Sequence, residues 1–343
     1  MEDKEAKLKL KAELLSSGTL FVPKEMRLPF PTSKSSAGPG AGSESIVVVF
    51  SGLRAMVPIS HDGGELELVD EGDGNYSISK GGKTIAKDVT LLPTLCHAPG
   101  QAFVSLGRSC KMKCAFCTMN EAAAKADITV DEALEIILAA SKREGFSSVA
   151  VTSGVQTTID DQVDRMAQLV SAVRAKLPYV PIGVEPLVEK KEQIAKLKKA
   201  GATEIKINLE AATNEIFEKA CPNRDVETAI KAIHWAVHEF GKGAVTSNII
   251  VGLGETDQQV RDALDMLAGI GCAGNLRALR INSMNGDRLR IALGKLEPVS
   301  KERMMKLAKI HDAILKEHGL STKTFKTMCF PCSCCDLVPG IDF

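Results

Sequence analysis

Three cysteines stand close together in the segment Ser-Cys-Lys-Met-Lys-Cys-Ala-Phe-Cys-Thr: Cys110, Cys114 and Cys117. Their C-x3-C-x2-C spacing places three thiols within eight residues. Four thiolates would complete the coordination of zinc or of a cubane iron–sulfur cluster, whereas three leave one iron of a cubane without a protein ligand. Such an open iron can bind a small molecule through its amine and carboxylate groups. The spacing therefore favours a [4Fe–4S] cluster with an open iron; a zinc site completed by a distant ligand is the alternative.

A second group of cysteines lies near the C-terminus, in the segment Cys-Phe-Pro-Cys-Ser-Cys-Cys: Cys329, Cys332, Cys334 and Cys335. Four thiols within seven residues can supply all or most of the ligands of a second metal site. Adjacent cysteines rarely bind one zinc ion with good geometry, so the four thiols predict an iron–sulfur centre, with or without one thiol left over. A zinc site that fixes the tail and a redox-active thiol pair are the alternatives.

The composition is that of a globular protein with a full core: 343 residues, 44% hydrophobic and 25% charged. The formal net charge is zero, so no basic face is indicated and nucleic acid is not expected as a partner. No apolar run of membrane-spanning length and no signal-peptide pattern is present, so we expect a cytoplasmic protein without a membrane partner. Ten cysteines in such a chain indicate metal or redox chemistry rather than structural disulfides.

The elements that must position these cysteines begin with an N-terminal region of two parts. Residues 4–16 predict a short helix, and residues 32–45, rich in Ser, Gly, Ala and Pro, predict a linker. Short alternating segments between Gly-rich turns follow over residues 46–92 and predict a small antiparallel sheet. We therefore expect a helix and linker over residues 1–45 and a small β-rich domain over residues 46–100.

From residue 101 onward, predicted strands alternate with predicted helices, which implies parallel βαβ units. The six repeats carry no Gly-rich dinucleotide fingerprint, so an open barrel suits them better than a Rossmann sheet. We expect an α/β fold with a partial (β/α)6 barrel over residues 101–320 and a Cys-rich tail over residues 321–343. The predicted strands are 102–106, 148–152, 180–185, 204–210, 244–252 and 277–282, and the predicted helices are 129–140, 160–176, 188–200, 213–219, 225–240, 256–270 and 300–318.

Polar and glycine residues follow the predicted strands, where α/β folds gather their chemistry. The cysteine loop follows the first strand, and Ser153 and Gly154 follow the second. Asn208 and Glu210 end the fourth strand, and alternation points both side chains the same way. A buried carboxylate at position 210 needs a partner, which a ribose with two hydroxyls or a structural salt bridge would supply.

Two further positions come from the fifth and sixth strands. Gly252, Gly254 and Glu255 form a turn into the next helix, and an ordinary glycine-rich turn is the alternative to a ligand-binding one. On the predicted strand 277–282, Arg280 faces one side and Arg277 the other. Arginines that point into a barrel bind carboxylate or phosphate, and a rim salt bridge to a helix is the alternative.

These residues together resemble the radical S-adenosylmethionine (radical SAM) superfamily, and in particular its biotin synthase-like branch. The cysteine spacing matches the superfamily motif, and the segment Asn-Ile-Ile-Val-Gly-Leu-Gly-Glu over residues 248–255 is similar to the Ile-x-Gly-Leu-Gly-Glu turn of that branch. The resemblance covers residues 101–320. It implies a [4Fe–4S] cluster on the three cysteines with SAM on the open iron. The residues it assigns to SAM are Ser153 and Gly154 at the amine, Asn208 and Glu210 at the ribose, and Gly252, Gly254 and Glu255 at the adenine. Arg280 is a further expected cofactor contact because of its place on the predicted strand.

The resemblance implies an enzyme that cleaves SAM reductively to a 5′-deoxyadenosyl radical and removes hydrogen from an unactivated carbon. Auxiliary clusters in the superfamily serve sulfur insertion or electron relay, so sulfur insertion with a second iron–sulfur cluster in the tail is the leading interpretation. Rearrangement, methylation or cofactor assembly is the alternative within the enzymes, and a non-catalytic iron–sulfur carrier is the alternative outside them. The implied partners are a small-molecule or carrier-protein-bound substrate and an electron donor such as ferredoxin or flavodoxin, under anaerobic conditions.

The chain departs from the standard sulfur-inserting enzymes. It lacks the usual N-terminal cysteine triplet and the Ser-rich C-terminal segment of lipoyl synthases, and it has no clear match to the second-cluster cysteines of biotin synthase. Some archaeal lipoyl-forming proteins resemble biotin synthases in sequence, and the chain is similar to that group as well. The sequence names neither the substrate nor the catalytic residues that would act on it.

Overall fold

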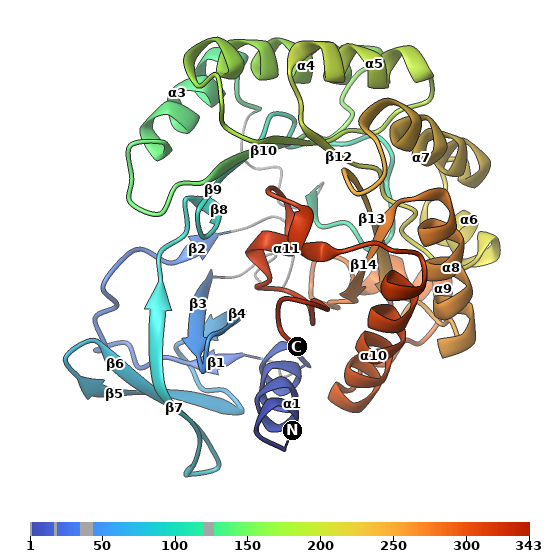
Figure 1. The fold of residues 1–343 in the computed structure, drawn as a ribbon. Helices are drawn as coiled ribbons and strands as arrows, with labels where there is room; N and C mark the ends of the chain where they lie inside the picture. The colour runs from blue at the N-terminus through green and yellow to red at the C-terminus, as the bar shows by residue number, and fades with distance from the viewer. Residues whose placement is uncertain (1, 17–18, 35–43, 120–126) are drawn as a thin grey trace.

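The chain folds around two seven-stranded sheets, which Figure 1 shows next to each other. This computed structural model describes residues 2–16, 19–34, 44–119 and 127–343. The C-terminal tail lies between the two sheets. Its short helix α11 lies inside the curve of the sheet that contains β9 to β14 (Figure 1).

The barrel sheet has the order β14-β13-β12-β11-β10-β9-β8. All neighbours from β9 to β14 pair in parallel, and β8 adds to β9 as an antiparallel edge. Because spatial order follows chain order, the predicted six βα units are confirmed. The strands are β8 (Cys96–Ala98), β9 (Gln101–Ser105), β10 (Ser148–Thr152), β11 (Ile182–Glu185), β12 (Glu204–Lys206), β13 (Val245–Val251) and β14 (Ala273–Ala278).

Six of the eight barrel helices, all except α5 and α9, begin with an oxygen-bearing side chain that caps the first turn. The Thr129 hydroxyl accepts a hydrogen bond from the Glu132 amide at 3.1 Å, and the Glu132 carboxylate accepts one from the Thr129 amide at 2.7 Å. Thr129 is therefore the N-cap, as predicted. Thr158, Thr213 and Thr256 cap their helices in the same way. The helices are α3 (Val130–Ala140), α4 (Ile159–Lys176), α5 (Lys191–Ala200), α6 (Asn214–Ala220), α7 (Val226–Phe240), α8 (Asp257–Ile270), α9 (Gly286–Leu293) and α10 (Lys301–Glu317).

The N-terminal sheet has the order β2-β3-β4-β1-β5-β6-β7, and β3 also pairs with β7, so it closes on itself. The predicted β-rich region is present, but the strand β4 was missed because Pro58 interrupts its apolar run. Part of the predicted linker, residues 35–43, lies outside the described residues. The strands are β1 (Leu20–Phe21), β2 (Ser33–Lys34), β3 (Glu44–Phe50), β4 (Leu53–Ser60), β5 (Leu66–Gly72), β6 (Asn75–Lys80) and β7 (Lys83–Leu92).

The N-terminal helix α1 (Glu2–Ser16) packs against α10 and holds the C-terminal tail. The Lys11 side chain is fully buried and donates to the Ser333 carbonyl at 2.6 Å and to the Asp342 carboxylate at 2.7 Å. A buried lysine is costly unless its charge is paired and its donors are used. The two ends of the chain are therefore joined through one buried ion pair.

The tail crosses the barrel at the N-terminal ends of its strands. It comprises a 3₁₀ turn (Thr322–Thr324) and α11 (Cys329–Cys332). The Glu204 carboxylate, at the start of β12, accepts from the Lys326 and Thr327 amides at 2.7 and 2.9 Å. Gln101, at the start of β9, accepts from the Met328 amide at 2.7 Å. The tail therefore enters the curl from the end opposite to the cysteine loop.

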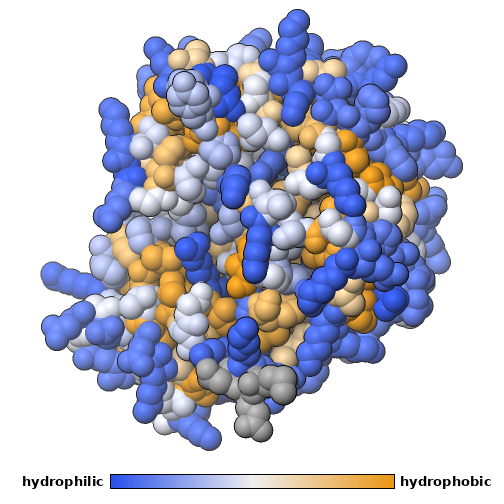
Figure 2. Space-filling view, in the orientation of Figure 1, coloured by the Kyte–Doolittle hydropathy of each residue, from blue (hydrophilic) through white to orange (hydrophobic). Residues whose placement is uncertain are grey.

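In the described part of the chain, no helix is both long and apolar enough to cross a bilayer. Figure 2 shows hydrophilic side chains over most of the periphery in the orientation of Figure 1, with apolar ones between them. An exposed apolar side chain is ordinary when it stands alone.

Buried His311 on α10 predicts a pH dependence of folding. Its exposure is 1%, and burial lowers its pKa from 6.5 to about 4. Below about pH 6.5, His311 binds a proton in the unfolded chain, whereas in the folded chain it stays neutral until about pH 4. The free energy of unfolding therefore falls as the pH falls through this window. We expect the His311 contribution to reach about 3 kcal/mol at pH 4. Urea unfolding of His311→Leu across this window should show a shallower loss than the parent.

The exposed His234 on α7 provides the matched control. His234→Leu controls for the replacement of a histidine by leucine as such, and its urea unfolding is measured over the same pH window. Equal slopes in the parent and in His311→Leu would contradict the prediction.

Candidate functional site

The cysteine loop leaves β9 at its C-terminal end, as predicted. Its cysteines are free of disulfides: Cys114 is buried, and Cys110 and Cys117 are partly buried. The Val155 amide donates to Cys110 Sγ at 3.4 Å, and the amide of the residue after Cys114 donates to the Ala220 carbonyl at 2.7 Å. Three cysteine thiols on a backbone-anchored loop are the kind and number of donors that a [4Fe–4S] cluster with one open iron takes from a protein.

Ser153 and Gly154 pack directly against this loop. The Gly107 amide donates to Ser153 Oγ at 3.0 Å, and the Gly154 amide donates to the Gly107 carbonyl at 3.0 Å. A Cβ on Gly154 would collide with the Ser109 carbonyl oxygen and lie 2.8 Å from Met119 Sδ. Only glycine allows the second strand exit to approach the cysteine loop this closely. Contact of these two residues with SAM stays a prediction.

Glu210 has the buried partner that its position requires. Its carboxylate lies 2.9 Å from Arg224 Nη1, and Arg224 Nη2 donates to the Asn208 carbonyl at 2.9 Å. The side chains of Arg224 and Glu210 are only 9% and 12% exposed. Burial raises the pKa of the Glu210 carboxyl, and the charge of Arg224 opposes that shift. The structural salt bridge is therefore present, and ribose contact by Asn208 and Glu210 stays a prediction.

Arg224 is a site residue that the sequence did not reveal. Its guanidinium lies 5.3 Å from the centre of the Phe217 ring and stands beside the cysteine loop. The pKa of Cys114 is lowered, first by a hydrogen bond with the Cys221 thiol and also by the charge of Arg224. An arginine in a rim loop carries no motif, so only its pairing with Glu210 identifies it. A carboxylate bound at the cysteine loop would meet this cation.

Glu255 shapes the turn after β13. Its two carboxylate oxygens accept from the Gly252 and Leu253 amides, each at 2.8 Å, and Arg303 donates to it at 2.8 Å. Gly252 and Gly254 have φ values of +103° and +110°, which other residues rarely adopt. The carboxylate thus fixes the turn from within, and contact of the turn with adenine stays a prediction.

A belt of hydrogen-bonded polar side chains lines the inside of the barrel. Asn208 Nδ2 donates to Glu185 at 2.8 Å, and Asn208 Oδ1 accepts from the Asn248 amide at 3.1 Å. Asn275 Nδ2 donates to Asn248 Oδ1 at 3.0 Å, and Lys206 pairs with Glu185 at 3.0 Å. Parallel register brings these residues to neighbouring positions on β11 to β14. Of this belt, the sequence had singled out Asn208 alone.

The tail thiols meet this belt from the other end. Cys329 Sγ lies 3.4 Å from Lys206 Nζ and 3.1 Å from Arg277 Nη2. Arg277 also pairs with Asp336 at 3.3 Å, and one Asp336 oxygen is buried with no hydrogen-bond partner among the described residues. An unsatisfied buried carboxylate oxygen is costly, and nearby cations favour thiolate ligands. These side chains do not converge closely enough in the described residues to hold one metal ion, so a second metal centre in the tail stays a prediction.

The prediction for the sixth strand was wrong in its bounds. β14 spans Ala273–Ala278, so Arg277 lies within it and Arg280 lies beyond it. Arg277 reaches the barrel interior, where its guanidinium contacts Cys329 and Asp336. Arg280 donates a hydrogen bond to the Leu15 carbonyl at the end of α1. A cofactor contact of Arg280 stays a prediction.

A cavity of about 400 Å³ opens at the rim beside Arg224, within the size range of small-molecule sites. It lies between the segment after β11 and the start of α7. Its lining includes Leu187, Val188, Glu189, Asn223, Arg224 and Thr228. Within the described ranges, no three His, Cys, Asp or Glu side chains converge closely enough to hold one metal ion.

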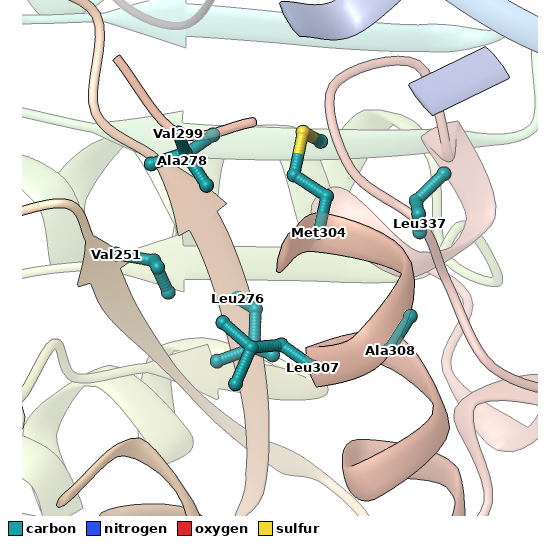
Figure 3. Close-up of a pocket in the computed structure, with 8 residues that line it drawn as sticks. All are labelled: Val251, Leu276, Ala278, Val299, Met304, Leu307, Ala308 and Leu337. Carbon is teal, nitrogen blue, oxygen red and sulfur yellow. The ribbon is translucent and has the colours of Figure 1, made fainter. Parts of the chain in front are cut away.

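A second cavity, of about 20 Å³, lies between α10 and the strands β13 and β14. Figure 3 shows Met304 and Leu307 from α10 facing Val251, Leu276 and Ala278 from the strands. An apolar space of this size suits one water at most and offers it no polar partner. It is a packing gap on the outer side of the sheet.

Residues 104–267 match the sequence model of the Radical SAM superfamily. The chain is 30% identical over 178 residues to a lipoyl synthase of Corynebacterium glutamicum (strain R), which covers 50% of this chain and 48% of that protein. It is 27% identical over 226 residues to a lipoyl synthase of Nitratidesulfovibrio vulgaris (strain DP4), which covers 64% of this chain and 72% of that protein. The chain thus spans about half the length of the corynebacterial relative.

Two solved structures have a similar fold. The FeFe-hydrogenase maturase HydG from Carboxydothermus hydrogenoformans aligns with a TM-score of 0.53 at 16% identity, over 65% of this chain and 55% of that one. Methylornithine synthase (PylB) aligns with a TM-score of 0.50 at 18% identity, over 62% of this chain and 63% of that one. At these identities the likeness concerns the fold, an open α/β barrel.

Proposed function

The chain carries a radical SAM domain over residues 104–267, and we propose that it cleaves SAM reductively and inserts sulfur into an unactivated carbon–hydrogen bond. Cys110, Cys114 and Cys117 hold the [4Fe–4S] cluster in this proposal. When bound, the cluster supplies the electron for cleavage, and SAM supplies the 5′-deoxyadenosyl radical that removes the hydrogen.

The residues around the cysteine loop bind and orient SAM. Arg224 is a buried cation beside the loop and would meet the carboxylate of SAM. Asn208 and Glu210 are proposed for the ribose, and the Gly252 turn is proposed for the adenine. Ser153 and Gly154 fix the position of the cysteine loop relative to β10 through their hydrogen bonds with Gly107.

The observation that carries the sulfur-insertion proposal is the position of the tail. Its thiols do not lie on the outer surface but inside the curl, with Cys329 against Lys206 of β12 and Arg277 of β14. A sulfur source must share the interior space with the substrate carbon. The second iron–sulfur centre that we propose for Cys329, Cys332, Cys334 and Cys335 meets this condition, and the likeness to lipoyl synthases supports a fatty acyl substrate.

An external electron donor follows from the need to reduce the cluster, and we propose a ferredoxin or flavodoxin. Lys111 and Lys113 are exposed on the cysteine loop, so the surface of this loop carries two positive charges. Acidic redox proteins are attracted by such a surface.

The test uses anaerobically reconstituted protein with SAM, dithionite and an octanoyl-lysyl peptide as the substrate probe. We expect 5′-deoxyadenosine and a thiolated peptide by mass spectrometry. The variant with alanine at all four tail cysteines should still form 5′-deoxyadenosine but no thiolated peptide, whereas Cys96→Ala, at an exposed cysteine, should match the parent.

Two results would contradict the proposal. A protein that binds iron but forms no 5′-deoxyadenosine would be a carrier rather than an enzyme. Thiolation that persists without the tail cysteines would remove the tail as the sulfur source.

A further inference from the structure

A fourth thiol lies beside the cysteine loop, on a different element of the barrel. Cys221 caps the C-terminal end of α6 and is fully buried. Its side chain is hydrogen-bonded with the side chain of Cys114. The proposed cluster takes its three thiols from the loop, so Cys221 has no part in it.

The backbone holds Cys114 and Cys221 next to each other. The Ala115 amide belongs to the peptide group that follows Cys114, and the Ala220 carbonyl belongs to the peptide group that precedes Cys221. These two peptide groups are joined by a hydrogen bond of 2.7 Å. The Cys221 amide donates to the Phe217 carbonyl at 2.7 Å, which completes the last turn of α6. The contact between the thiols is therefore set by the backbone on both sides and not by side-chain rotation alone.

Packing in the core does not by itself account for this contact. Cys272 is also fully buried, and burial alone raises the pKa of its thiol. The pKa of Cys221 is raised first by the hydrogen bond with Cys114 and then by burial. Cys272 thus fills space in the core, whereas Cys221 is directed at the sulfur of another cysteine.

The two thiols differ in how easily a small oxidant reaches them. Cys114 is 9% exposed and Cys221 is 0% exposed, so a molecule such as hydrogen peroxide meets Cys114 first. A thiol that is oxidised to the sulfenic acid condenses with a neighbouring thiol to form a disulfide. Without such a neighbour, oxidation continues to the sulfinic acid, which is irreversible for most proteins.

We propose that Cys221 is the resolving thiol of Cys114 in the cluster-free protein, and that hydrogen peroxide links the pair as a disulfide. In the first step, the Cys114 sulfur takes one peroxide oxygen as the O–O bond breaks, and one water leaves. In the second step, the Cys221 sulfur attacks the Cys114 sulfur, so the S–S bond forms as the S–O bond breaks and a second water leaves. Two thiols and one peroxide thus give one disulfide and two waters.

The consequence for the cluster rests on the proposed function, because it takes Cys114 as a cluster ligand. While the Cys114 sulfur is bonded to Cys221 it cannot bind iron, so the loop cannot take up its cluster. A dithiol regenerates both thiols by disulfide exchange, and the loop can then bind iron again. The pair therefore keeps Cys114 in a recoverable form when the protein meets an oxidant without its cluster.

The test is peptide mapping of cluster-free protein after treatment with hydrogen peroxide and then with N-ethylmaleimide. Trypsin separates the relevant cysteines into one peptide with Cys110, one with Cys114 and Cys117, and one with Cys221. We expect the second and third peptides to be joined, with fragmentation placing the link at Cys114, and dithiothreitol should separate them. Iron uptake during anaerobic reconstitution should be lower after peroxide and should return to the untreated level after dithiothreitol.

Replacement of Cys221 removes the resolving thiol. After peroxide, Cys114 in Cys221→Ala should carry two added oxygens, and dithiothreitol should not restore iron uptake. Cys221→Ser changes the volume of the side chain least and should give the same result. Cys272→Ala is the matched control for the loss of a buried thiol, and it should form the link between Cys114 and Cys221 as the parent does.

The outcomes distinguish this proposal from the proposed function. A link within the cysteine loop, or a Cys114 with two added oxygens in the parent, would overturn the role of Cys221 and leave the cluster assignment in place. A link between Cys114 and Cys221 that leaves iron uptake unchanged would overturn Cys114 as a cluster ligand, while the disulfide would stand.

Discussion

Replacement of Cys110, Cys114 and Cys117 with alanine together is expected to abolish SAM cleavage while the protein stays folded. The thiols are the proposed cluster ligands, and without them the electron for cleavage has no route to SAM. The fold should survive because the loop is anchored by backbone groups, such as the Lys111 amide on the Val155 carbonyl at 2.8 Å. We expect 5′-deoxyadenosine formation to fall to background.

The measurement is chromatography of 5′-deoxyadenosine after anaerobic incubation with SAM and dithionite, together with iron content and the urea midpoint. Cys272→Ala is the matched control, because Cys272 is fully buried and stands in the chain between α8 and β14, outside both cysteine-rich segments. Undiminished cleavage by the triple variant would refute the assignment of the cluster. Collapse of the urea midpoint would show instead that the loop thiols support the fold.

The barrel could be predicted because its information is local. A typical βα unit has a short apolar strand, a capping residue and an amphipathic helix. Thr129 and Thr256 are two such capping residues. The bounds of the sixth strand could not be predicted, since Ala273–Ala278 contains Gly274 and Asn275, which are depleted in strands. Burial between β13 and α10 decides that strand, and burial is a property of the whole fold.

The site was predictable only where residue spacing carries the chemistry. Three thiols within eight residues predict an iron–sulfur cluster loop from the sequence alone. Arg224 and Lys206 belong to no sequence motif. They are identified as site residues only by their contacts, Arg224 with Glu210 and Lys206 with Cys329, which the fold brings together. The path of the tail into the barrel depends on Glu204 at the start of a strand, a contact between residues more than a hundred positions apart.

Arg224→Met is expected to have the second-largest effect, because it leaves Glu210 as an unpaired buried acid. Loss of one partner of a buried ion pair costs about 3–5 kcal/mol of the free energy of unfolding. We expect the lower end, since burial already raises the pKa of Glu210 and lets it accept a proton. Loss of a charge-assisted hydrogen bond to the SAM carboxylate should also weaken SAM binding about tenfold to a hundredfold.

The double variant Arg224→Met with Glu210→Gln separates the two roles of the arginine. It removes the unpaired acid, so urea unfolding should recover most of the lost stability. If Arg224 contacts the SAM carboxylate, equilibrium dialysis should still find weak SAM binding in the double variant, because the cation remains absent. Parental SAM affinity in that variant would mean that Arg224 serves only to neutralise Glu210. Arg224→Lys should have a stability and a SAM affinity between those of the parent and of Arg224→Met. A lysine keeps the charge beside the cysteine loop but cannot bridge Glu210 and the Asn208 carbonyl with a planar fork.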